Sequence, residues 1–159
     1  MNYAGILLVF LAASITALQT AAAVKAWVRP AAADRCSVCG MFVSKYPAWT
    51  AEIVFKDGSY VVFDGAKDMF AYYSDIRKYS PSKKRGDIAS MYVMDYYAVS
   101  FIDARSAYYV GGSDVRGPMG NELVAFASES DAREFKEDHK GKAVLTFGAV
   151  TPEILKDLR

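Results

Sequence analysis

The chain of 159 residues contains two cysteines and one histidine, and this shortage limits the folds open to it. At most one disulfide can form, which excludes the small domains that depend on a disulfide framework. A closed zinc site of four Cys and His ligands cannot be assembled, and neither can a three-histidine or HExxH catalytic site. The fold must therefore be held by a hydrophobic core, and 53% of the residues are hydrophobic.

Charge and motifs exclude several classes of function. Lys and Arg number 19 and Asp and Glu number 18, so the net charge is +1. No broad basic field is available to hold nucleic acid, and we expect no nucleic-acid partner. P-loop, dinucleotide-binding and nucleophile-elbow motifs are absent, since Gly111-Gly112-Ser113 lacks the GxGxxG spacing. We therefore expect a protein that is not an enzyme.

The N-terminal segment is typical of an export signal. Residues 1–24 contain no charged side chain, and Ala21-Ala22-Ala23 provides a processing site after an apolar run. We predict a signal peptide over residues 1–23 or, because about 20 apolar residues can span a bilayer, an uncleaved N-terminal membrane anchor. In either form the protein is periplasmic or otherwise extracytoplasmic, and in the uncleaved form residues 1–24 are the route of membrane attachment. A Pro/Ala linker follows over residues 24–33.

Alternating and helical patterns predict strands and helices in a regular order. Asp57-Gly58 marks a hairpin turn, Asp64 and Ser128 are the expected helix N-caps, and residues 111–120 are expected to form a Gly-rich loop. Strands are predicted over residues 49–55, 60–63, 91–94, 98–103, 108–110, 123–127 and 143–147. Helices are predicted over 66–79 and 129–139, with a short terminal helix opening at 151–153.

A weak repeat with an offset of 63 residues connects the two halves of the chain. Val61 corresponds to Val124 and Phe63 to Phe126, and both copies have the same order of elements. We therefore predict an α+β fold in which two β-β-α-β repeats form one compact domain. This domain covers residues 34–159, with halves of about 34–95 and 96–159.

The segment Cys36-x-x-Cys39-Gly40-Met41 places three sulfur atoms within six residues. The spacing lets a turn bring two thiolates to one metal ion, and Gly40 allows a sharp turn without a Cβ clash. Met119 lies between Gly and Pro residues, where it has no helical or strand periodicity to satisfy. Thiolate and thioether are soft donors that favour Cu(I) over Mg, Ca or Mn.

Two other interpretations of the cysteines stay open. The pair could form a disulfide in an oxidising compartment and act as an exported thiol–disulfide redox protein. It could also be a structural bridge in a non-catalytic interaction module. A thioredoxin-like motif would lie between a strand and a helix, whereas Cys36 follows a linker and precedes a strand.

Taken together, several motifs resemble the NosL family, the accessory proteins associated with nitrous-oxide reductase assembly. They are Asp34-x-Cys36-x-x-Cys39-Gly40-Met41, a strand hairpin ending in Phe63, Gly117-Pro118-Met119-Gly120 and the apolar run 122–126. The resemblance covers about residues 34–147. Family members are often lipoproteins, but no cysteine follows the apolar segment near Ala21 to Ala23.

The resemblance implies an exported metallochaperone that binds Cu(I). The family's Cys-x-Met pair corresponds to Cys39 and Met41, its distant methionine to Met119, and Cys36 completes the CxxC form of the motif. Cys36, Cys39, Met41 and Met119 are therefore the expected metal ligands. The implied acceptor is an apo copper enzyme resembling nitrous-oxide reductase, and a membrane copper exporter is a candidate donor.

Overall fold

The structure is a computed structural model that describes residues 26–158. The predicted signal peptide or membrane anchor over residues 1–23 lies outside the described residues. Between residues 26 and 158, no helix has both the length and the apolar character needed to cross a membrane.

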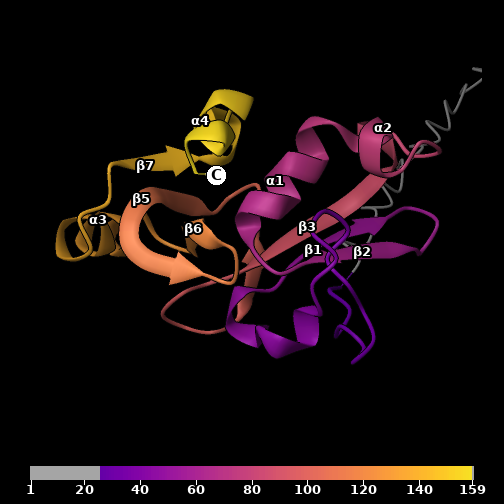
Figure 1. Ribbon diagram of the computed structural model, residues 1–159, viewed down its shortest axis with the longest axis horizontal. Helices are drawn as coiled ribbons and strands as arrows, with labels where there is room; N and C mark the ends of the chain where they lie inside the picture. The colour runs from indigo at the N-terminus through magenta and orange to yellow at the C-terminus, as the bar shows by residue number, and fades with distance from the viewer. Residues whose placement is uncertain (1–25, 159) are drawn as a thin grey trace, which may run out of the picture.

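The prediction of an α+β fold is confirmed, because the described chain combines two antiparallel sheets with short helices (Figure 1). The strands are β1 Ala51–Phe55, β2 Tyr60–Phe63, β3 Ile88–Met94, β4 Phe101–Asp103, β5 Tyr108–Gly117, β6 Gly120–Phe126 and β7 Ala143–Thr146. The α-helices are α1 Ala66–Ser74, α2 Ile76–Tyr79, α3 Glu129–Asp138 and α4 Pro152–Asp157. Single 3-10 turns cover Val43–Lys45, Pro47–Trp49, Arg85–Asp87 and Phe147–Ala149.

The two sheets have similar strand orders. The first sheet has the order β2-β1-β3-β4, and the second has the order β6-β5-β7. In the first sheet β1 lies between its hairpin partner β2 and β3, the strand that follows a helix. In the second sheet β5 lies in the same way between β6 and β7. β4 pairs with β3, so the first sheet continues past residue 95, where we expected one half to end. The repeat in the amino-acid sequence itself stays a prediction.

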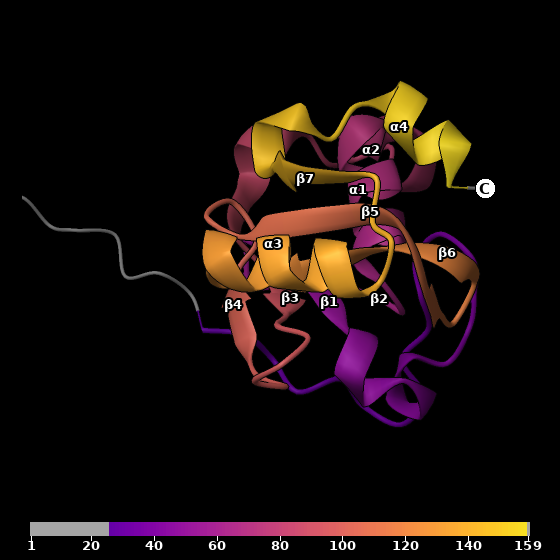
Figure 2. The same ribbon diagram turned by 90° about the vertical axis from the view of Figure 1, so that its left-hand side faces the viewer.

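The main core joins both sheets into one domain. It contains side chains of β1, α1 and β3 together with residues of β5, β6 and α4. Leu123 and Ala125 of β6 face this core, while Val124 and Phe126 face the other way, toward α3 (Figure 2). Both faces of β6 are therefore buried, which explains why its sequence is a continuous apolar run rather than an alternating one.

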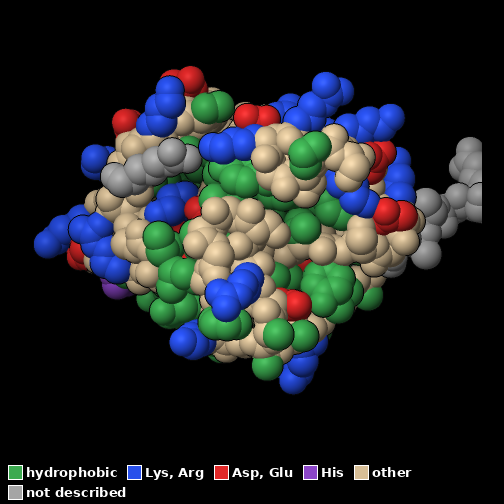
Figure 3. Space-filling model, turned by 45° about the vertical axis from the view of Figure 1, so that its right-hand side comes forward, with side chains coloured by type: hydrophobic (Ala, Val, Ile, Leu, Met, Phe, Trp, Pro, Cys, Tyr) green, Lys and Arg blue, Asp and Glu red, His purple; other side chains and the backbone are tan. Residues whose placement is uncertain are grey.

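The surface carries charges of both signs. In Figure 3, Lys, Arg, Asp and Glu side chains lie mainly around the rim of the face shown, and hydrophobic side chains lie toward its middle. This face has no extended area of a single charge sign, as the nearly balanced composition predicts.

The first predicted helix is shorter than expected and is capped differently. α1 ends at Ser74, and Asp75 leaves the helical conformation before α2 begins. The residue before α1 is Gly65 in an extended conformation, and the prediction that Asp64 caps the helix is wrong. Ser128, in contrast, accepts a hydrogen bond from the backbone N of Asp131 at 3.1 Å, so the prediction for α3 is confirmed.

The predicted Gly-rich loop over residues 111–120 is also wrong, because most of it belongs to strand β5. Gly111 pairs with Leu123 and Arg116 pairs with Asn121, so four residues of β5 face the single residue Glu122 of β6. A bulge of this kind bends and twists a strand. Gly112, with a φ of 74°, adopts the left-handed conformation that the bulge requires.

The residue opposite the bulge, Glu122, connects β6 to the start of α1. Its Oε1 accepts hydrogen bonds from the backbone N of Lys67 at 2.6 Å and from that of Leu123 at 2.9 Å. Glu122 thereby satisfies a donor of the first helical turn that no side chain preceding the helix reaches. A Cβ atom at Gly65 would overlap the Glu122 carboxylate, and one at Gly117 would approach the Glu122 Cβ to 3.0 Å.

Replacing this buried carboxyl should change how stability depends on pH. Burial raises the pKa of Glu122 from its ordinary value near 4.5 to about 7. The folded state then holds the proton more tightly than the unfolded state, so this contribution is present below pH 4.5 and is lost as pH rises through about 7. Glu122→Gln keeps the acceptor oxygen and cannot ionise. We expect its free energy of unfolding, relative to the unmodified protein, to rise by up to about 3 kcal/mol over that range.

Denaturant unfolding at several pH values measures this difference. Burial also raises the pKa of Glu52 to about 7, but Glu52 is common to both proteins and cancels in the comparison. Glu134→Gln, on the exposed surface of α3, is the matched control and should run parallel to the unmodified protein. A Glu122→Gln curve parallel to that control would show that Glu122 is not protonated in the folded state.

Candidate metal centre

The two cysteines lie on a short loop that folds back on itself. The backbone N of Cys36 donates to the carbonyl of Met41 at 2.8 Å, and the N of Gly40 donates to the carbonyl of Cys36 at 2.9 Å. Gly40 has a φ of 80°, so the absence of a Cβ is what allows the expected turn. The loop is held against β2 by a hydrogen bond from Ser37 N to Val62 O at 3.1 Å.

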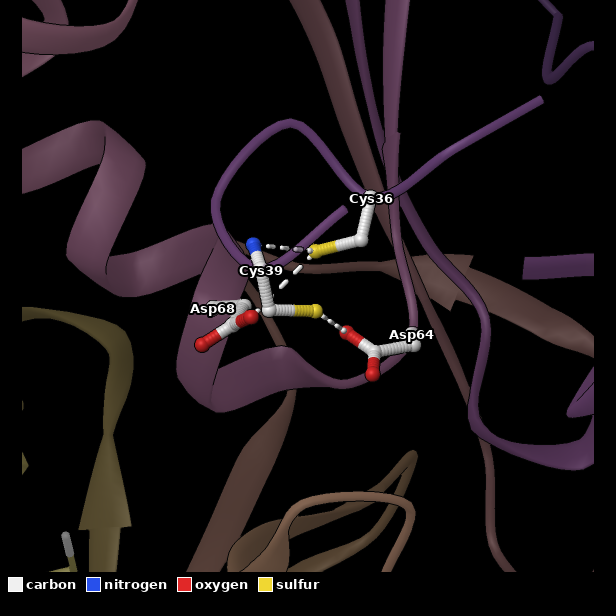
Figure 4. Close-up of side chains that lie close together, drawn as sticks. All are labelled: Cys36, Cys39, Asp64 and Asp68. Carbon is white, nitrogen blue, oxygen red and sulfur yellow. Dashed lines mark hydrogen bonds between the residues drawn. The ribbon is translucent and has the colours of Figure 1, made fainter. Parts of the chain in front are cut away.

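Two aspartates that the sequence did not mark as ligands face this loop (Figure 4). Asp64 follows the last residue of β2, and Asp68 lies in the first turn of α1. The Cys39 thiol donates to Asp64 Oδ1 at 3.3 Å, and the Cys36 thiol donates to Asp68 Oδ2 at 3.2 Å. One ligand atom from each of these four residues lies within 4.8 Å of the others.

The surroundings keep both thiols protonated at neutral pH. Cys36 is buried and Cys39 is partly exposed. Burial raises the pKa of Cys36, and burial also raises the pKa of Cys39, to about 11. Burial raises the pKa of Asp68 as well. The four residues therefore form two thiol–carboxylate hydrogen bonds in a region that disfavours further negative charge.

This donor set fits a metal ion. The Oδ2 atom of Asp64 is buried and has no hydrogen-bond partner among the described residues, so one acceptor is left open. Two sulfur and two oxygen donors converge, and a cation bound among them would offset part of the negative charge that remains when the thiol protons leave. Both cysteines are free within the described chain, so no disulfide occupies the cluster.

The predicted methionines lie on two different segments. Met41 belongs to the cysteine loop itself. Met119 lies at the turn between β5 and β6 with 48% of its surface exposed. The Lys67 ammonium donates to the carbonyl of Met119 at 3.4 Å and to that of Asn121 at 2.5 Å, so this turn lies against the first turn of α1. The structure thus brings both cysteines together and places the Met119 turn beside the helix that carries Asp68. That the thioethers of Met41 and Met119 bind the metal stays a prediction.

The sequence pattern did not single out the two aspartates as ligands. Asp64 precedes α1 and was assigned to the helix N-cap on local grounds, and the Glu122–Lys67 contact shows that this role is filled by a distant residue. Asp68 lies in the first turn of α1, and only the folded structure shows that it faces Cys36.

An α+β domain with one buried and one partly exposed thiol on a Cys-x-x-Cys-Gly-Met loop defines a small protein with a sulfur-containing candidate metal centre. The family model described as NosL matches residues 28–155. The chain therefore belongs to the NosL family, and the resemblance of its motifs to that family is confirmed.

One curated relative and one crystal structure agree with this assignment. The chain is 32% identical over 132 residues to the copper-binding lipoprotein NosL of Stutzerimonas stutzeri, which covers 78% of this chain and 65% of the relative's length. It is 26% identical to the crystal structure of the copper chaperone NosL from Shewanella denitrificans, with a TM-score of 0.67 over 82% of this chain and 98% of that one. The solution structure of the apo-NosL protein from Achromobacter cycloclastes is 27% identical, with a TM-score of 0.47 over 66% of this chain and 87% of that one.

The raised thiol pKa values predict slow alkylation. A Cys39 pKa of about 11 leaves only ~10⁻⁴ of this thiol ionised at pH 7. We expect iodoacetamide to modify Cys39 slowly, with a rate that increases about tenfold per pH unit, and to modify the more deeply buried Cys36 more slowly still.

Mass spectrometry of timed samples locates the modified cysteine, and Cys39→Ser isolates the rate of Cys36. Redox-active cysteines have lowered pKa values and react quickly at neutral pH. Rapid modification of Cys39 at pH 7 would therefore contradict the protonated pair and favour the thiol–disulfide alternative.

Proposed function

We propose that this protein is a non-enzymatic Cu(I) carrier that acts outside the cytoplasm and delivers copper for the assembly of a copper enzyme. The observation that carries the proposal is the convergence of the Cys36 and Cys39 sulfurs with two carboxylates in one cluster. The names of the relatives in Stutzerimonas and Shewanella, a copper-binding lipoprotein and a copper chaperone, support copper as the metal. Thiolate sulfur is the protein donor that favours Cu(I).

Copper uptake by this cluster releases protons. One Cu(I) ion and two thiols give a bis-thiolate complex and two protons, with no change of oxidation state. The Cys36 and Cys39 protons already point at Asp68 Oδ2 and Asp64 Oδ1, so the carboxylates are placed to accept them before they reach water. A protonated carboxyl beside the complex also limits the negative charge in a partly buried site.

Met41 and Met119 complete the proposed ligand set. A thioether is a soft, uncharged donor, so it can bind Cu(I) without adding negative charge. Met119 is half exposed at the tip of a hairpin, where an incoming protein can reach it. A partner's ligands can replace such a weak donor first and the two thiolates afterwards, which suits transfer rather than storage.

The acceptor we propose is an apo copper enzyme resembling nitrous-oxide reductase, and the donor is a membrane copper exporter. Membership of the NosL family and the copper chaperone name of the Shewanella structure support a copper-accepting partner. We further propose that residues 1–24 attach the protein to the membrane on the extracytoplasmic side. The sequence of this segment and the lipoprotein name of the Stutzerimonas relative support that location.

Removing one thiolate should nearly abolish tight copper binding. We expect Cys39→Ser to lower the Cu(I) affinity by about a hundredfold or more, because a hydroxyl is a poor ligand for a soft cation. Competition titration against a chromophoric Cu(I) chelator under anaerobic conditions measures the loss. Ser37→Ala, in the same loop, is the matched control and should bind as the unmodified protein does.

The same titration with Zn(II) tests the choice of metal. If zinc bound more tightly than Cu(I), or if Cys39→Ser kept its Cu(I) affinity, the proposed copper site would have to be abandoned.

Removal of the hairpin thioether should have a smaller effect. We expect Met119→Ala to weaken Cu(I) binding by about tenfold and to leave the thermal unfolding midpoint unchanged, because the side chain is half exposed. Met94→Ala is the matched control, since it removes a thioether from β3. Equal Cu(I) affinities for the Met119→Ala protein and this control would remove Met119 from the ligand set.

A further inference from the structure

Most of the strongly exposed hydrophobic side chains gather in one place. The described residues contain four large ones: Trp27 is 44% exposed, Tyr97 48%, Val99 59% and Met119 48%. Met119 belongs to the hairpin turn beside the metal centre. The Trp27 ring packs on Phe101 of β4 at 4.8 Å between ring centroids, and Val99 and Tyr97 lie on the turn just before β4.

The turn that presents Val99 and Tyr97 is built firmly. Asp95 is buried, and its Oδ1 accepts hydrogen bonds from the backbone N atoms of Tyr97 at 2.9 Å and Ala98 at 2.7 Å. Its Oδ2 accepts from Ala127 N at 2.7 Å, which ties the turn to the end of β6.

Val99 itself has a φ of 49°, an uncommon conformation for a β-branched residue. A well-anchored turn that holds a strained, exposed valine is a feature that local folding alone does not explain.

A cavity of about 570 Å³ opens beside this turn. Trp27, Met94, Val99 and Phe101 supply apolar walls, and Arg29 is the one charged residue among the described residues that line the cavity. A mainly apolar hollow with one cation in its lining matches a molecule with an apolar body and an anionic group.

The position of this surface in the chain indicates what covers it. The described chain begins at Ala26 beside β4 (Figure 2), and Trp27 is its second residue. Residues 1–24, directly before it, contain no charged side chain and are long enough to span a bilayer. A domain connected to such a segment by so few residues must lie close to the lipid surface, with the side that carries Trp27 nearest to it.

We propose that the surface formed by Trp27, Val99 and Phe101, hereafter the lipid-facing surface, lies against the phospholipid bilayer. Tryptophan is favoured at the membrane interface, where its apolar ring is buried and its N–H stays hydrated. Val99 enters the region between headgroups and acyl chains, and Arg29 pairs with a lipid phosphate. This inference rests on the membrane attachment proposed above.

The acidic residues of α3 set the limit of this surface. Glu134 and Asp138 lie close enough to Tyr97 to act on its phenol electrostatically. Anionic headgroups repel carboxylates, so we place Tyr97 at the limit of the surface that contacts lipid.

Docking in this orientation would point the metal centre away from the membrane. β4 and β2 are the two edges of the first sheet, and Cys36 forms a bridge with Val62 on β2. Three strand spacings of about 4.8 Å, roughly 14 Å in all, separate those edges. The cysteine loop therefore stays accessible to a partner while the opposite edge rests on lipid.

Fluorescence quenching by brominated lipid tests the proposal in the full chain. Trp27→Phe with Trp49→Phe removes both natural tryptophans, and Val99→Trp then adds a single reporter to the lipid-facing surface. Gly148→Trp in the same background is the matched control, because Gly148 is exposed and a Cβ atom added there would meet no other atom within 4 Å. Both proteins are reconstituted in vesicles of phosphatidylethanolamine and phosphatidylglycerol with brominated acyl chains.

We expect the reporter at position 99 to lose roughly half of its fluorescence and the one at 148 to be unaffected, as for a side chain buried at the headgroup–acyl boundary. A second reporter, Phe101→Trp, replaces one half-buried ring by another and covers the case in which the substitution at the strained position 99 unfolds the domain.

Absence of quenching at both 99 and 101, in protein that still sediments with vesicles, overturns the lipid-facing surface and leaves a protein partner as its occupant. Failure to sediment overturns the membrane attachment as well. Neither result bears on copper binding.

Discussion

The hydrogen bond from Lys67 N to the Glu122 carboxylate is the contact on which the arrangement of this domain depends. It attaches the start of α1, which packs on the first sheet, to β6 of the second sheet. The Lys67 ammonium strengthens the same junction through the carbonyls of Met119 and Asn121. The bulge in β5 provides the space, because four residues there face Glu122 alone. Helix start, hairpin turn and strand bulge are therefore parts of one junction.

This junction also determines the chemistry of the neighbouring site. Because a distant glutamate satisfies the helix N-terminus, Asp64 is not needed as a cap and can accept the Cys39 thiol instead. Asp68, one residue after Lys67, faces Cys36 in the same way. The protein thus holds its two sulfurs in the protonated form, each paired with a base. Because the thiolate is the form that oxidants attack and metals bind, raised thiol pKa values slow oxidation, and binding of a soft cation requires the protons to leave.

The sequence predicted those parts of the fold that depend on short-range patterns. The Asp57-Gly58 hairpin, the Ser128 cap, the CxxC turn at Gly40 and the α+β class all follow from residues close together in the chain. The errors arose where a contact beyond the local pattern decides the outcome, as the contact between Lys67 and Glu122 does for the start of α1. The glycines of 111–117 indicate a loop by composition, yet Gly111 pairs with β6 on one side and β7 on the other, and Gly117 pairs with Gly120 of β6. Both cysteines were found from their spacing, whereas Asp64 and Asp68 required the tertiary structure.

The tight packing of glycine against Glu122 has a consequence for how this sequence can vary. Gly65 precedes α1 and Gly117 ends β5, but a side chain at either one would crowd the Glu122 side chain. The three positions should therefore change together in evolution: a relative with alanine at the place of Gly65 is expected to have a smaller residue at the place of Glu122. Such a relative would need another cap for its first helix, and the nearest candidate is Asp64, which here accepts a hydrogen bond from the Cys39 thiol.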